Sequence, residues 1–78
     1  MEDLKVFIQN ELSELVFKTV SFDEKLISTK TLDSISLIDL IVAIEDHLDI
    51  SIPTSDVIES NFDSIDLISE YINNLRTK

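Results

Sequence analysis

The sequence predicts an all-α protein, a four-helix bundle with a long first loop and a short third helix. Three observations predict this fold. Apolar residues recur at helical spacing in three stretches, no clear period holds over residues 17–33, and Pro53 ends the middle stretch. A chain of 78 residues leaves no room for a second core, so we expect residues 1–78 to form one domain.

The first helix is predicted over residues 2–16. Its apolar residues recur at i, i+4, i+8 and i+11, and they are Leu4, Ile8, Leu12 and Leu15. The connection that follows is unusually long for a compact domain. We expect it to be an ordered loop held down by its own apolar side chains, Phe22, Leu26 and Ile27.

The second helix is predicted over residues 34–48 and has two apolar faces. The face expected in the core carries Leu37, Leu40, Ile41, Ile44 and Leu48. A second apolar row lies roughly opposite and consists of Ile35, Ile38 and Val42. Three acidic residues fall among them, Asp39, Glu45 and Asp46. This row predicts an exposed interaction stripe. The alternative is that the long loop or another helix covers it.

The third helix is expected to be short. Residues 51–52 before Pro53 are expected to be extended, and Thr54 or Ser55 can cap a helix over residues 56–60. Residues 61–62 are expected to form a turn that is plugged by the aromatic ring of Phe62.

The last helix is expected to run to about Leu75, with Asp63 or Ser64 as its cap. Its buried row consists of Ile65, Ile68, Ile72 and Leu75. We expect Tyr71 to pack, and the cations Arg76 and Lys78 suit a helix C-terminus. Because the chain has no glycine, helix ends and turns are expected to use Asn, Asp and Ser.

The charge of the chain is concentrated in its second half. The formal net charge is −10, and residues 31–75 hold ten acidic residues but no lysine or arginine. This charge argues against binding to nucleic acid and against direct insertion into an anionic membrane. It is either a solvated surface that keeps the protein soluble or a docking face for basic patches on partner proteins.

Targeting and redox signals are absent from the sequence. There is no cysteine, no apolar run reaches the length of a membrane span, and Glu2 and Asp3 do not suit a signal peptide. We therefore expect a cytoplasmic protein and, at this size, a monomer.

Ser34 lies where the second helix is predicted to begin. Asp33 can accept backbone N–H bonds as the N-cap, which leaves Ser34 in the first turn. The positive end of the helix dipole would stabilise a phosphate ester on this serine, and its oxygen would be reachable from solvent.

The chain itself lacks the groups for catalysis. The only imidazole belongs to His47, thirteen residues and roughly 20 Å along the helix from Ser34. His47 therefore cannot act as a base for that serine and is expected at the surface. No EF-hand pattern is present, and we assign no metal site.

A longer pattern surrounds the serine. It consists of Leu32-Asp33-Ser34-Ile35 followed by Leu37, Leu40, Ala43-Ile44-Glu45, Leu48-Asp49-Ile50 and Ile52-Pro53. With these residues, the chain closely resembles the discrete, type II acyl carrier proteins over essentially its whole length. The three-residue Asp-Ser-Ile motif is a weak signal by itself. Its position and its continuation make the resemblance specific.

The resemblance implies a non-catalytic carrier. Ser34 would receive 4′-phosphopantetheine from coenzyme A, with Asp33 as its motif partner, and the thiol of this arm would hold an acyl group as a thioester. The implied partners are a phosphopantetheinyl transferase, an acyl- or aminoacyl-loading ligase, and synthase or transferase enzymes with basic docking patches. The implied partner-facing residues are Ile35, Ile38, Asp39, Val42, Glu45 and Asp46.

Three departures separate the chain from the housekeeping fatty acid carrier. Thr31-Leu32 stands where that type usually has glycine, Ser36 replaces an acidic residue, and residues 61–65 replace a threonine-rich turn. The Leu-Asp-Ser, Ala-Ile-Glu and Asp-Ile-x-Ile-Pro pieces resemble D-alanyl carriers and carriers of specialised pathways more closely.

Three functions therefore compete. The first is a carrier of acyl intermediates in a fatty acid, polyketide or specialised pathway. The second is a D-alanyl or other aminoacyl carrier loaded by an adenylating ligase. The third is an acidic interaction module that carries nothing, such as a mimic of nucleic acid. A second Asp-Ser-Ile at residues 63–65 lacks the downstream context, so we favour Ser34 over Ser64 as the attachment site.

Overall fold

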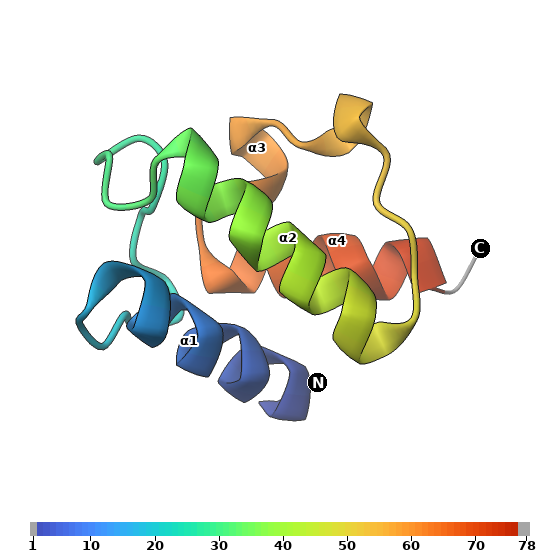
Figure 1. Ribbon diagram of the computed structural model, residues 1–78, viewed down its shortest axis with the longest axis horizontal. Helices are drawn as coiled ribbons and strands as arrows, with labels where there is room; N and C mark the ends of the chain where they lie inside the picture. Colours follow the sequence, from blue (N-terminus) through green and yellow to red (C-terminus); the bar gives the residue numbers. More distant parts are fainter. Residues whose placement is uncertain (1, 77–78) are drawn as a thin grey trace.

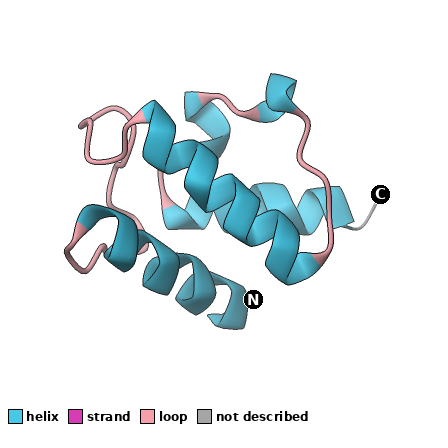
Figure 2. Ribbon diagram, in the orientation of Figure 1, coloured by secondary structure: helices cyan, strands magenta, loops and turns pink. Residues whose placement is uncertain are grey.

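The computed structural model describes residues 2–76. Its elements in chain order are α1 (Glu2–Val16), α2 (Ser34–Leu48), the 3-10 helix η1 (Thr54–Asp56), α3 (Glu59–Phe62) and α4 (Ile65–Arg76) (Figure 1). Residues 2–76 contain helices and loops but no strand (Figure 2). The all-α, four-helix fold is as predicted, and the first two helices have the predicted bounds. Lys78 lies outside the described residues.

The core is built from the predicted apolar rows. Helix α1 packs against α2 and α4, and α3 packs against α4. The buried apolar residues of the three long helices are Leu4, Ile8 and Leu12, then Leu40, Ile41 and Ile44, then Ile65, Ile68 and Ile72. The outermost predicted members pack only at the edge of this core, and they are Leu15, Leu37, Leu48 and Leu75. None of the helices in the described part has the length and apolar character needed to span a bilayer.

His47 is exposed, as expected, and its ring contacts α1. Its ring stacks on that of Phe7, with centroids 3.9 Å apart and planes within 12°. This contact joins the last turn of α2 to α1.

The short third helix is not where the sequence predicted it. A helix over residues 56–60 is wrong, because the 3-10 turn η1 ends at Asp56 and α3 begins only at Glu59. Between them, Ile58 is extended, with φ −129° and ψ 160°. Pro53 is the residue before η1, so neither Thr54 nor Ser55 serves as the expected side-chain cap. Phe62, expected in a turn, is the last residue of α3 and is fully buried.

Long-range contacts explain this shift. The Tyr71 hydroxyl donates a 2.6 Å hydrogen bond to Asp56 Oδ2, and Asn61 Nδ2 donates to the Asp56 carbonyl at 2.9 Å. These bonds fix the backbone at Asp56, and burial of Phe62 against Tyr71, with ring centroids 5.4 Å apart, fixes α3. Burial, followed by the bond to Asp56, raises the pKa of Tyr71 to about 12. Tyr71 therefore packs, as expected, and also ties η1 to α4.

The carboxylate of Asp63, one of the two residues expected to cap α4, instead holds the long loop. It accepts hydrogen bonds from the backbone N–H groups of Leu26, Ile27 and Ser28 at 3.1, 2.7 and 3.0 Å. The hydroxyl of Ser28 also donates to it. The hydrogen bond from the Ser28 N–H, with help from the others, holds the pKa of Asp63 below its ordinary value although burial opposes this. Ser64 is the cap of α4, since its Oγ accepts from the Leu67 N–H.

Apolar anchors act together with this carboxylate. Val20, Leu26 and Leu32 of the loop are buried, while Phe22 and Ile27 pack at the edge of the core. The predicted apolar anchoring of the loop is therefore confirmed.

Within residues 2–76, three residues adopt left-handed backbone conformations although none is glycine. Asp49 ends α2 with φ 56°, as expected for a chain that lacks glycine. Phe17 (φ 61°), directly after α1, and Lys30 (φ 62°), within the long loop, are also left-handed. These two residue types are unfavourable in this region and were not predicted there.

Candidate functional site

The N-terminus of α2 has the geometry of a capped helix. Asp33 is extended, with φ −85° and ψ 176°, and its Oδ1 accepts the Ser36 N–H at 2.8 Å. Hydrogen bonds from Ser36, its backbone N–H first, hold the pKa of Asp33 below its ordinary value. The preceding residue, Leu32, is buried, and its N–H donates to the carbonyl of Leu26. The cap is thus connected to the part of the loop that Asp63 holds.

Ser34 is the first residue of α2 and is exposed. Within residues 2–76 its hydroxyl has no hydrogen-bond partner, so the oxygen is open to solvent. Ser64, in the second Asp-Ser-Ile, differs in both respects. It is 5% exposed, and its oxygen is engaged by the Leu67 N–H at the start of α4.

A groove begins at Ser34 and follows α2. It has a volume of about 560 Å³ and separates α2 from the segment that leads through η1. The lining residues are Ser34, Leu37, Ile38, Ile41, Val42 and Glu45 on α2, and Ile52, Thr54 and Val57 opposite. The opposite wall was not predicted, because it is formed by residues that lie near α2 only after the chain has folded.

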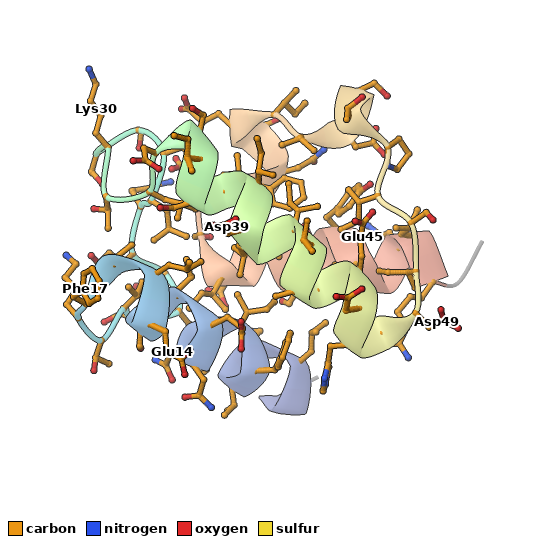
Figure 3. The ribbon with its side chains drawn as sticks, in the orientation of Figure 1. Glu14, Phe17, Lys30, Asp39, Glu45 and Asp49 are labelled. Atoms are coloured by element: carbon orange, nitrogen blue, oxygen red, sulfur yellow. The ribbon has the colours of Figure 1, made fainter. Side chains whose placement is uncertain are left out.

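Glu45 connects the two walls of the groove. Its Oε2 accepts the backbone N–H of Ile52 at 2.7 Å. In Figure 3 the Glu45 side chain lies between α2 and the segment that follows it, whereas Asp49 points away from the body of the protein. The carboxylate thus joins the two walls at a point eleven residues along α2 from Ser34.

Comparison with known proteins identifies the family. The model of the phosphopantetheine attachment site family matches residues 19–72. The chain is also 34% identical over 76 residues to the D-alanyl carrier protein of Streptococcus mutans. The aligned region covers 95% of this chain and 96% of that protein. The chain belongs to the acyl carrier protein family. A carrier of this family is not an enzyme, and its attachment site takes 4′-phosphopantetheine covalently.

The carrier protein has a serine that fits this group. An attachment residue needs a hydroxyl that a second enzyme can reach and a setting that tolerates a phosphate. Ser34 has an unengaged, exposed oxygen at the positive end of a 15-residue helix. As a carrier, the protein interacts with a phosphopantetheinyl transferase and with loading enzymes.

The second apolar row of α2 is uncovered in the carrier protein. Ile35, Ile38 and Val42 are 72%, 59% and 49% exposed. Neither the long loop nor another helix buries them, so the interpretation of this row as an exposed stripe is favoured over the alternative. Asp39 and Asp46 beside them are exposed, while Glu45 is half-buried. Their role in docking partners stays a prediction.

The acidic side chains of the carrier protein between positions 31 and 75 are largely without ion-pair partners in the described residues. Of the ten acidic residues between positions 31 and 75, Asp66 alone forms an ion pair within residues 2–76, with Lys5 at 2.9 Å. Repulsion among the others disfavours the folded state, and salt screens it. We expect the melting temperature to rise when sodium chloride or magnesium chloride is added at neutral pH. A melting temperature that is unchanged by both salts would contradict this electrostatic account.

Proposed function

We propose that the carrier protein holds an aminoacyl group, D-alanyl in particular, as a thioester on a 4′-phosphopantetheine arm attached to Ser34. The observation that carries this proposal is the 34% identity to a D-alanyl carrier protein over nearly the full length of both chains. The departures from the fatty acid type near the serine agree with it, namely Thr31-Leu32 before Asp33 and Ser36 after Ser34. A cytoplasmic location stays a prediction.

A second candidate is a carrier of fatty acyl or polyketide intermediates. The apolar lining of the groove beside Ser34 favours it, because such a surface suits a hydrocarbon chain. The third function, an acidic module that carries nothing, is set aside by the family to which the chain belongs.

In attachment, Ser34 would act as a passive acceptor. Its Oγ attacks the phosphorus of coenzyme A that bears the pantetheine, a P–O bond forms, and the P–O bond to 3′,5′-ADP breaks. The hydroxyl proton would go to a base of the transferase. His47 cannot take it, because it lies about 20 Å along α2 from Ser34. The loading ligase would then couple the carboxyl group of the amino acid to the thiol and release AMP from an adenylate.

The proposed cargo is tested by loading the holo-protein. The protein, carrying the arm after treatment with coenzyme A and a broad-specificity transferase, is incubated with ATP and either D-alanine plus a D-alanine-activating ligase or octanoate plus a fatty-acid-activating ligase. We expect intact-mass analysis to show D-alanyl on the wild type and on Ser64→Ala, and neither group on Ser34→Ala. Loading of octanoyl without D-alanyl would contradict the proposed cargo and support the second candidate.

A further inference from the structure

The groove contains one charged side chain. Among the nine residues that line it, only Glu45 is ionisable. Its Oε2 is held by the Ile52 N–H, whereas its Oε1 has no hydrogen-bond partner within residues 2–76. The half-buried carboxylate therefore presents a free oxygen to a surface that is otherwise mainly aliphatic.

The rise along the α2 axis from Ser34 to Glu45 matches the length of the arm. Glu45 follows Ser34 by eleven residues, which is about 16 Å along a helix axis. Thirteen covalent bonds separate the phosphorus of phosphopantetheine from its sulfur, an extended length of about 16 Å. An arm that starts at Ser34 and lies along α2 would therefore bring its sulfur level with Glu45.

We propose that the Glu45 carboxylate binds the ammonium group of the aminoacyl thioester, so that the groove accepts a cationic cargo in preference to a neutral one of the same shape. This inference rests on the proposed function, in which Ser34 carries the arm. In an aminoacyl thioester the ammonium nitrogen lies two bonds from the thioester carbonyl carbon. The ammonium group can therefore bind Glu45 while the thioester stays in the groove. Partial burial of Glu45 strengthens such a pair relative to one in bulk water.

The other acidic residues of α2 do not offer this site. Asp39 and Asp46 are exposed and do not line the groove. Asp46→Asn is thus a matched control. Asp46 follows Glu45 directly, and its replacement by Asn removes the same charge from the same helix. Glu45→Gln retains an oxygen that can accept the Ile52 N–H, so it removes the charge and keeps the bond that connects the two walls.

The test measures how long the thioester survives. Holo wild type, Glu45→Gln and Asp46→Asn are loaded on Ser34 with D-alanyl or with isobutyryl, which replaces the ammonium by a methyl group. Hydrolysis at pH 7 is followed by intact mass. We expect Glu45→Gln to speed loss of D-alanyl by about two- to five-fold, the range set by a half-exposed ion pair, and to leave loss of isobutyryl unchanged. Asp46→Asn is expected to change neither rate. In the wild type, we expect the NMR resonance of the Ile52 backbone amide, which donates to Glu45, to differ between the D-alanyl and the isobutyryl form.

The outcomes separate this inference from the proposed function. If no arm appears on Ser34, the proposed function is wrong. If D-alanyl loads normally and hydrolyses at the same rate in wild type and Glu45→Gln, the ammonium site is wrong while the proposed function stands. Equal acceleration of isobutyryl loss would show an opened groove, and equal acceleration in Asp46→Asn would show a general charge effect. Either result overturns the site.

Discussion

Asp63→Ala is expected to lower the free energy of unfolding by about 3 kcal/mol, a large part of the stability expected for a chain of 78 residues. The substitution removes the buried acceptor of the Ile27 and Ser28 N–H groups. The Leu26 N–H keeps a second acceptor, the Asp63 carbonyl at 2.7 Å. Two backbone hydrogen bonds to a charged group are therefore lost without replacement, together with the bond from the Ser28 hydroxyl. Urea unfolding followed by circular dichroism measures the change.

Asp23→Ala is the control for this prediction. Asp23 lies in the same loop but is exposed. We expect its replacement to change the free energy of unfolding by less than about 0.5 kcal/mol. Equal unfolding midpoints for the two variants would show that Asp63 does not hold the loop.

The pH dependence gives a second readout of Asp63. Its pKa is lower in the folded state than in the unfolded state, so its contribution is fully present above the unfolded pKa. That contribution is lost as the pH falls below about 4 and through the folded pKa. Asp63→Asn should therefore show a smaller loss of stability than the wild type between pH 5 and pH 3.

Ser34→Ala is expected to abolish the gain of one phosphopantetheinyl mass on incubation with coenzyme A and a broad-specificity transferase, whereas Ser64→Ala is expected to gain it fully. A transferase can reach only an exposed oxygen. Ser34 presents one at the start of α2, whereas Ser64 is buried and its oxygen accepts the Leu67 N–H. Intact-mass analysis of both variants and the wild type measures the difference. A gain that survives in Ser34→Ala would contradict the assignment.

The sequence predicted those parts of the fold that depend on local patterns. The bounds of α1 and α2 follow from apolar periodicity and from the Asp33 cap, and each of these is confined to a few neighbouring residues. The third helix was misplaced because the position of α3 depends on contacts with Tyr71 in α4, which no local pattern records.

Two features near the site were missed for the same reason. The Asp63 carboxylate meets backbone groups 35 to 37 residues earlier in the chain. The groove has one wall on α2 and another from Ile52 to Val57. The exposed position of Ser34 at the start of α2, by contrast, could be predicted, because the helix start and the Asp33 cap lie within a few residues of it. Its role as the attachment residue stays a prediction.

Attachment of the arm to Ser34 is tested most directly by locating the modified residue in the wild-type protein. After treatment with coenzyme A and the transferase, the chain is digested and the peptide that carries phosphopantetheine is fragmented by tandem mass spectrometry. We expect the fragment ions to place the whole group on Ser34. A group placed on Ser64 or on any other residue, or a chain that stays unmodified throughout, would contradict this expectation.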